Sequence, residues 1–381
     1  MNLLGIIAEY NPFHNGHKYH IEKSNEDLNP DATVVVMSGN FTQRGNCACY
    51  DKWTRTKCAL LNGADLVIEL PVTFATGSAE RFATGSVYLL DKIGVKNISF
   101  GSESPLSELQ AIADKLISDE LVINSSSEVP FHIARQKAID DSEILSKPNN
   151  ILAIEYLKAL KVLNSCITPH RIERYAVGYN DLFTNDGFAS ATKVRELINN
   201  KNTYKDVIPQ NVFEIISNSK FVNDEAVFNS IKYSIISKTP EELSTYAHIR
   251  EGIENRIYKS TFGASSLDGL IKEIKSKRYT YTTISRMLVS ILLGIKKENL
   301  SDYPGYIRVL GLNDKGALAL KYIKSNCELP IITKISSAIE NLSPSALKEL
   351  KTDIIASDIY YTCADITTSA SPDFINSPIK I

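Results

Sequence analysis

Short apolar segments alternate with amphipathic stretches through the first half of the chain. Short apolar runs bounded by turn residues are typical of buried parallel strands, and here they cover residues 3–8, 33–37, 66–70 and 97–100. Apolar positions at helical spacing predict helices over residues 17–24, 79–93, 106–117, 127–140 and 150–163. This alternation predicts an α/β fold built on a doubly wound parallel sheet.

The pattern becomes mainly helical after about residue 200. The same spacing predicts helices over residues 211–218, 225–237, 240–259, 266–276, 281–293, 317–324 and 344–355. The length of 381 residues allows more than one domain. We therefore expect an α/β domain over residues 1–200, followed by a mainly α-helical C-terminal domain over residues 201–381.

The first apolar run leads into a His-x-Gly-His motif at residues 14–17. Gly16 has no Cβ to hold a ligand away from the backbone, and the free N–H groups of a helix's first turn favour anions. His14 and His17 share one face of that turn, where each can donate a hydrogen bond to a phosphate oxygen and either can be cationic near neutral pH. A polar helix cap with two surface histidines would have the same sequence. Because the motif follows an apolar strand, we favour a site for a nucleotide's phosphates.

A second candidate segment has the sequence Ser-Ala-Thr-Lys-Val-Arg at residues 190–195. Ser190 or Thr192 can cap a helix, while Lys193 and Arg195 offer ammonium and guanidinium donors suited to β- and γ-phosphates. A capped amphipathic helix with a solvated charge would look the same. Combined with the His-x-Gly-His motif, the segment is better explained as a second phosphate-binding element.

Together the two motifs resemble the signatures of the HIGH-motif nucleotidylyltransferase superfamily, and longer strings resemble the tRNA(Met) cytidine acetate ligase family. The strings are EYNPFHNGH (9–17), MSGNFTQRG (37–45), KWTR (52–55), ADLVIELP (64–71), FGSE (100–103), PNNIL (148–152), SAT (190–192) and KRYTY (277–281). They extend over nearly the whole chain. The resemblance implies a Rossmann-like nucleotidylyltransferase fold for the α/β domain.

The resemblance also implies an activity with two half-reactions. ATP would activate acetate as acetyl-adenylate, with Mg²⁺ bridging phosphates, and the acetyl group would pass to N4 of the wobble cytidine of elongator tRNA(Met), forming N4-acetylcytidine. In the first half-reaction a carboxylate oxygen attacks the α-phosphorus and pyrophosphate leaves, so the enzyme contributes orientation and positive potential. His14 and His17 would stabilise the transition state, and Lys193 and Arg195 would hold the departing pyrophosphate.

The resemblance assigns a nucleotide cradle to one continuous segment and three separate positions. The segment comprises Ile7, Ala8, Glu9, Tyr10, Asn11, Pro12, Phe13, His14, Asn15, Gly16, His17, Lys18, Tyr19 and His20. The separate positions are Gly101, one of Asn149 and Asn150, and Arg174. Each of these three has a structural alternative: a turn glycine, a helix N-cap, and an arginine at a strand edge.

Composition is compatible with a cytoplasmic enzyme. Hydrophobic residues make up 43% of the chain, enough for sizeable cores. The first apolar run follows no basic segment and ends at Glu9, so we expect neither a signal peptide nor a membrane span. Cys47, Cys49 and Cys58 lack CxxC spacing and a nearby histidine, so they are better explained as reduced thiols, and we expect no protein metal site.

The net charge of −2 excludes a strongly basic protein, but one segment is locally basic. Cationic residues gather there around Tyr279 and Tyr281: Lys272, Lys275, Lys277, Arg278 and Arg286. Interleaved cations and aromatics suit RNA phosphates and unstacked bases. The alternative is a helix connection with a solvated basic face, and the RNA surface would then lie around Gln43, Arg44, Lys52 and Arg55.

Two other functions remain compatible with these motifs. A nucleotidylyltransferase that makes a coenzyme precursor would use the same phosphate-binding pair, although many such enzymes need only the α/β domain. A non-catalytic RNA-binding protein could retain a nucleotide site, although the intact His14, His17 and Arg195 favour catalysis. The sequence leaves the oligomeric state open.

Overall fold

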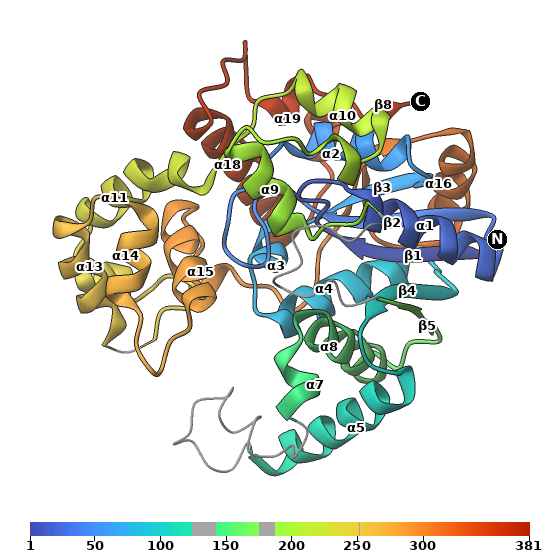
Figure 1. Cartoon of the computed structure of the whole chain (residues 1–381), viewed down its shortest axis with the longest axis horizontal. Helices are drawn as coiled ribbons and strands as arrows, with labels where there is room; N and C mark the ends of the chain where they lie inside the picture. The colour runs from blue at the N-terminus through green and yellow to red at the C-terminus, as the bar shows by residue number, and fades with distance from the viewer. Residues whose placement is uncertain (124–141, 175–186, 251) are drawn as a thin grey trace.

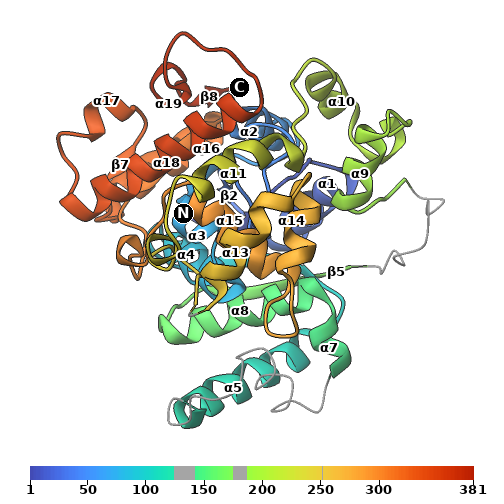
Figure 2. The same ribbon diagram turned by 90° about the vertical axis from the view of Figure 1, so that its left-hand side faces the viewer.

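A single mixed sheet with helices on both faces lies at the centre of the protein, as seen in a computed structural model (Figures 1 and 2). The structure describes residues 1–123, 142–174, 187–250 and 252–381; the helix predicted over residues 127–140 lies outside these ranges. The strands are β1 (Leu3–Ala8), β2 (Ala32–Ser38), β3 (Leu66–Leu70), β4 (Asn97–Ser102), β5 (Thr168–Glu173), β6 (Ile307–Leu312), β7 (Ile331–Ile332) and β8 (Ile379–Lys380).

The strand order is β5-β4-β1-β2-β3-β6-β7, with β8 paired to β6. Strands β1 to β5 are mutually parallel where they pair, and β6 runs antiparallel to β3. All four predicted strands are confirmed, β1 and β3 with the predicted bounds. The doubly wound parallel sheet is therefore confirmed for these strands and is completed by β5, which lacks a continuous apolar run, and by an antiparallel strand.

The two faces of the sheet are buried in separate apolar cores. Leu3 and Val34 belong to one core, whereas their neighbours Leu4 and Val35 belong to the other, as the two-residue period of a strand requires. Helices of the first core are α4 (Ala79–Lys92), α5 (Leu106–Ile123), α8 (Pro148–Val162) and α16 (Asp314–Asn326). Helices of the second are α1 (Asn15–Leu28), α2 (Lys52–Leu60), α9 (Ala191–Asn199) and α10 (Gln210–Ser217).

A group of helices beside the sheet has its own apolar core, and we call it the helical unit (Figure 1). Its members are α11 (Phe228–Ile236), α12 (Pro240–Leu243), α13 (Ile253–Gly263), α14 (Leu267–Ile274) and α15 (Tyr281–Leu292). The remaining helices are α3 (Val72–Ala75), α7 (Ser142–Ser146), α17 (Ile335–Ala338), α18 (Pro344–Cys363) and α19 (Pro372–Ile375), with short 3₁₀ turns η1 (Lys205–Val207), η2 (Asp224–Val227) and η3 (Lys297–Asn299).

The prediction of one helix over residues 240–259 is wrong. Helix α12 ends at Leu243 and α13 begins only at Ile253. Between them, the Ala247 N–H donates to the Ile295 carbonyl at 2.8 Å, and Gly252 adopts a φ of +89°. Tertiary pairing of this main chain with the end of α15 therefore replaces the helical bonds that the local pattern favoured.

The sheet crosses the boundary expected near residue 200. Strand β6 is fully buried between β3 and β7, and α16 packs on the first core. The helical unit has a core largely separate from the sheet, and a smaller apolar cluster joins α17 and α18. The chain therefore leaves the α/β layer, builds the helical unit and returns to the sheet, so the division into two consecutive segments at residue 200 does not describe the sheet.

Candidate functional site

The two histidines of the His-x-Gly-His motif form the first turn of α1 together. His14 is the N-cap, and its Nδ1 accepts from the Gly16 N–H at 3.1 Å, while His17 Nδ1 accepts from the His14 N–H at 3.3 Å. Their rings stack with centroids 3.7 Å apart. A Cβ on residue 16 would lie 2.9 Å from the His14 ring, which explains the glycine. Because each Nδ1 is an acceptor, each neutral ring carries its proton on Nε2, free to donate to a ligand.

Burial keeps the histidines of this turn neutral. It lowers the pKa of His14 to about 3, with further lowering by the positive charges of Arg174 and Arg195. It also lowers the pKa of His17 well below its usual value, and that of His20 to about 3. The expectation of cationic histidines near neutral pH is therefore corrected for the ligand-free protein: the rings are neutral donors and the arginines supply the positive charge.

Arg174, Asn149 and Gly101 meet at the ends of β4 and β5. Arg174 Nη1 donates to Asn149 Oδ1 at 2.6 Å, and the Arg174 side chain lies 2.8 Å from the place that a Cβ on Gly101 would take. Arg174 is also close enough to lower the pKa of His14, His17 and His20. The turn-glycine alternative is wrong, because Gly101 lies within β4.

The structure separates the two candidate asparagines. Asn150 is fully buried; its Oδ1 accepts from the Glu103 and Ser104 N–H groups, and its Nδ2 donates to Ser104 Oγ and the Ile144 carbonyl. Asn149 instead connects Arg174 with Glu103 Oε1, to which its Nδ2 donates at 2.6 Å. Neither is the N-cap of α8, which is Lys147. Asn149 is therefore the asparagine available for a ligand.

The second motif docks on the first. Ser190 caps α9 by accepting from the Lys193 N–H at 3.2 Å. Arg195 Nη1 donates to the Asn11 carbonyl at 2.5 Å, and Asn15 Nδ2 donates to the Gly187 carbonyl at 2.9 Å. Arg195 thus reaches the turn before α1, whereas Lys193 forms an ion pair with Glu196 on its own helix at 3.2 Å.

Other residues of the predicted cradle support the turn from behind. Tyr10 and Phe13 are buried and pack against the His17 ring, with centroids 4.9 Å and 5.6 Å from it. Asn11 Oδ1 accepts from the Cys49 N–H at 2.7 Å, and His20 Nε2 hydrogen-bonds Ser99 Oγ at 2.8 Å. These contacts fix the shape of the turn. The rest of the segment ends β1 (Ile7 and Ala8), follows it (Glu9 and Pro12) or lies in α1 (Lys18 and Tyr19).

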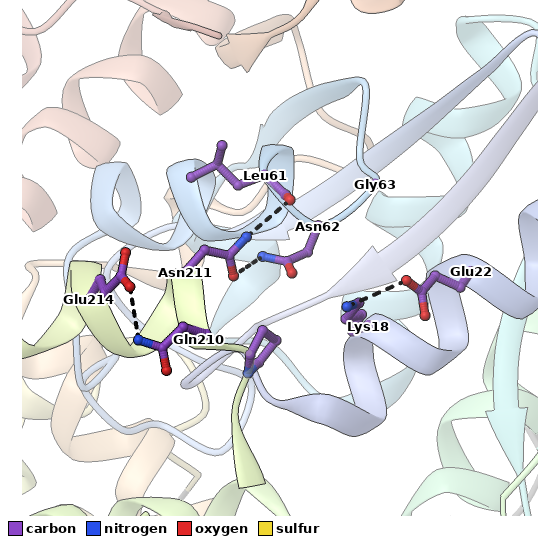
Figure 3. Close-up of a pocket in the computed structure, with 9 residues that line it drawn as sticks. Lys18, Glu22, Leu61, Asn62, Gly63, Gln210, Asn211 and Glu214 are labelled. Atoms are coloured by element: carbon purple, nitrogen blue, oxygen red, sulfur yellow. Dashed lines mark hydrogen bonds and ion pairs between the residues drawn. The ribbon is translucent and has the colours of Figure 1, made fainter. Parts of the chain in front are cut away.

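Lys18 lines a hollow that the histidines of the motif do not line. It lines a hollow of about 570 Å³ between α1, the turn after α2 and α10, together with Glu22, Asn62 and Asn211 (Figure 3). Lys18 pairs with Glu22 at 3.7 Å, and Asn211 Nδ2 donates to the Leu61 carbonyl at 3.3 Å. Neither histidine of the motif lines this hollow, so it is separate from the candidate site.

The sequence did not reveal the structural role of Arg55, which holds two loops of the site. Arg55 is fully buried and donates to main-chain carbonyls at the ends of β1 and β2, those of Glu9 at 2.7 Å and Ser38 at 3.0 Å among them. Lys52 is also buried, bonded to Glu69 and Asp373. Neither residue can therefore belong to an RNA surface, so that part of the alternative around residues 43–55 is wrong. Nothing in the sequence next to Lys52 and Arg55 indicates that these two charged side chains are buried.

The basic segment is only partly as predicted. Lys275, Lys277 and Arg278 are exposed. Tyr279, however, is buried in the core of the helical unit, and Tyr281 donates from its hydroxyl to Asp268 at 3.2 Å. The expectation of aromatic rings interleaved for base stacking is therefore wrong at Tyr279, while the exposed cations remain available. Lys272 is paired with Asp268.

The described ranges contain neither a cluster of metal-binding side chains nor a membrane-spanning helix. No group of three or more His, Cys, Asp or Glu side chains there is placed to hold a metal ion. Cys47, Cys49 and Cys58 are buried, and burial raises the pKa of each thiol. No helix in this part of the chain is long and apolar enough to cross a membrane.

Comparisons with known proteins agree with this geometry. A family model described as HIGH Nucleotidyl Transferase matches residues 1–372. A tRNA(Met) cytidine acetate ligase of Thermoanaerobacter sp. (strain X514) is 43% identical over the full length of both chains, and one of Clostridium perfringens is 41% identical over 100% of this chain and 99% of its own.

Solved structures of similar proteins indicate the same family. Thermotoga maritima TmcAL bound with alpha-thio ATP is 30% identical, with a TM-score of 0.90 over 100% of this chain and 99% of that one. The apo form of the same protein gives a TM-score of 0.91 over the full length of both chains at 30% identity. The chain therefore belongs to the tRNA(Met) cytidine acetate ligase family, within the HIGH nucleotidyl transferases.

Proposed function

We propose that this protein is an ATP-dependent ligase that activates acetate as acetyl-adenylate and transfers the acetyl group to N4 of the wobble cytidine of elongator tRNA(Met). The observation that carries the proposal is the meeting of His14, His17, Arg174 and Arg195 around one turn at the carboxyl ends of β1, β4 and β5. Ligands of open α/β sheets bind at this edge. The family's named activity supports the substrates, and a tRNA substrate supports a cytoplasmic location.

In the first half-reaction a carboxylate oxygen of acetate attacks the α-phosphorus of ATP, and the bond to the β-phosphate oxygen breaks. The Nε2–H groups of His14 and His17 would donate to the phosphoryl oxygens as charge develops. Arg195, beside His14, would hold the departing pyrophosphate, and Lys193 would join it by leaving Glu196. Asn149 and Arg174 would orient the nucleoside, close to the backbone at Gly101.

Mg²⁺ would bind at this site together with the triphosphate of ATP. The donors at the turn are N–H groups, and no described cluster of carboxylates, histidines and cysteines is placed to hold a metal. The ion would therefore be held by phosphate oxygens, whose charge it would partly neutralise.

In the second half-reaction the cytidine amine attacks the acetyl carbonyl and AMP leaves. The base must leave its stack to reach the adenylate at the turn before α1. We propose that the exposed cations Lys275, Lys277 and Arg278 of the helical unit bind the tRNA, because RNA affinity depends mainly on phosphate contacts.

Exchange of labelled pyrophosphate into ATP tests the first half-reaction. We expect acetate to support exchange without RNA. The assay compares acetate with longer acids, each with and without tRNA(Met). If ATP binds but no carboxylate supports exchange, a nucleotidylyltransferase of the coenzyme type becomes the better explanation.

The variants His17→Ala and Arg195→Ala test the assigned roles. Loss of one donor to a developing charge typically slows a reaction about 100- to 1000-fold, so we expect exchange to fall by that order in each variant. Lys23→Ala, on the same helix but outside the predicted cradle and paired with Asp27, is the matched control. Near-normal exchange in both variants would show that the motifs serve only as helix caps.

A further inference from the structure

Residues 39–48, here called the junction loop, connect the nucleotide site with the helical unit. The loop follows β2 and lies between the sheet and α15 (Figure 1). Ser285 Oγ on α15 donates to the Gly45 carbonyl at 2.7 Å. A Cβ on Gly45, which has a φ of +74°, would lie 2.5 Å from the main-chain nitrogen of Arg286. The loop therefore rests directly on the backbone of α15.

Gln43 of this loop contacts both Glu9 of the predicted nucleotide cradle and Arg286 of α15. The Gln43 N–H donates to Glu9 Oε1 at 2.7 Å, directly after β1. The Gln43 carbonyl accepts from Arg286 Nη1 at 3.5 Å. Arg286 is thus separated from the predicted nucleotide cradle by the main chain of a single residue.

Among the residues that the structure describes, the half-buried Arg286 has no acidic partner. Its other hydrogen bond goes to Thr283 Oγ1 at 3.3 Å, and no carboxylate among the described residues forms an ion pair with it. Burial alone lowers its pKa to about 10. Burial, with a further contribution from the charges of Arg286 and Arg81, lowers the pKa of nearby His248 to about 4.

The charge of Arg286, which bonds only neutral oxygens among the described residues, suits an anion. A partly buried guanidinium without a counter-ion is unfavourable, and a bound phosphate can accept two N–H bonds from it. Two further features favour RNA over a small anion. Arg44 is exposed on the junction loop, and the exposed Lys277 and Arg278 lie just before the start of α15, so both segments that meet at Arg286 carry exposed cations.

We propose that Arg286 binds a backbone phosphate of the tRNA close to the reacting nucleotide, so that the junction loop places the base beside the turn before α1. This inference rests on the proposed function and names the contact that brings its second substrate to the site. It assigns to Arg286 a substrate-binding role, distinct from that of the exposed cations at residues 275–278.

Binding of tRNA(Met) across a salt series tests the proposal. Arg286→Ala and Arg286→Gln remove the charge, and the glutamine keeps a polar side chain beside Gln43 if alanine impairs folding. For one lost phosphate contact we expect the slope of log affinity against log salt to decrease by about 0.7 to 0.9, with several-fold weaker binding at low salt. Arg286→Lys should retain the slope but bind more weakly, because it cannot donate two N–H bonds in parallel.

Lys259→Ala is the matched control, because it removes an exposed charge from α13 of the same helical unit. Thermal unfolding shows which variants are folded. Unchanged affinity and slope in folded Arg286→Ala or Arg286→Gln would overturn the proposal. It would also be overturned if inorganic phosphate inhibits tRNA binding by the native protein and the variants lose only this inhibition, with unchanged tRNA affinity. Failure of the proposed function would be detected separately, because the native protein would then show no acetate-dependent exchange of pyrophosphate into ATP.

Discussion

Two neighbouring asparagines at the start of α8 have different surroundings and therefore different expected roles. Asn150 makes four hydrogen bonds within the protein, whereas Asn149 bridges Arg174 and Glu103 at the surface of the candidate site. Asn150→Ala leaves buried main-chain groups unpaired, so we expect it to lower the free energy of unfolding by about 2 to 3 kcal/mol. Asn149→Ala should instead raise the KM for ATP about tenfold, the effect of one lost hydrogen bond.

Urea unfolding and pyrophosphate-exchange kinetics of both variants measure these effects. Each variant serves as the control for the other, because the substitutions are chemically identical and adjacent. A KM increase in Asn150→Ala with normal kinetics in Asn149→Ala would reverse the assignment.

His14 predicts a pH dependence of stability. Its pKa is about 3 in the folded protein, chiefly through burial, and near 6.5 in an unfolded chain. The unfolded chain thus binds more protons below pH 6.5, so stability is highest above pH 6.5 and is lost as the pH falls toward 3. For this residue alone the loss between pH 7 and pH 5 is about 2 kcal/mol. We expect the melting temperature of native protein to fall more over this range than that of His14→Gln; parallel decreases would contradict the prediction.

At the scale of elements, the connection between α14 and α15 carries the exposed cations assigned to tRNA. Replacing Lys275, Lys277 and Arg278 together by alanine should weaken tRNA binding and flatten its salt dependence, by roughly one counter-ion for each lost phosphate contact. Acetate-dependent exchange without RNA should persist, because these residues lie outside the nucleotide site.

The matched control replaces three exposed lysines of α16, which are Lys315, Lys321 and Lys324. If the control and the test variant bind tRNA equally across the salt series, the connection is a solvated surface. The RNA contacts must then be sought at Arg44 and Arg286 alone.

For the molecule as a whole, a buried charge network fastens the C-terminal segment to the sheet. Asp373 Oδ1 lies 2.8 Å from Lys52 Nζ and 3.0 Å from Arg308 Nη2, and Glu69 contacts the same two cations. Removing one member of such a network leaves a buried charge uncompensated, which typically costs about 3 to 5 kcal/mol. We expect Asp373→Asn to shift the urea midpoint strongly, whereas the exposed Asp302→Asn should not; similar midpoints would show that the network does not stabilise the fold.

The sequence by itself determined what depends on local pattern. Continuous apolar runs indicated β1 to β4, and the motif at residues 14–17 indicated the start of a helix, because the burial of a strand and the first turn of a helix depend on residues adjacent in the sequence. The resemblance then supplied the separate position at Arg174, which the structure brings to the same turn.

Only the tertiary structure decided which residues meet across long separations. It returned β6 to the edge of β3, buried Lys52 and Arg55, interrupted the helix expected over residues 240–259, and gave Asn149 and Asn150 different hydrogen-bond partners. In each case the outcome depends on partners far away in the chain, such as Asp373 for Lys52. A charged residue has the same local pattern whether solvent or a buried counter-ion surrounds it, so its role follows only from the packing of the whole molecule.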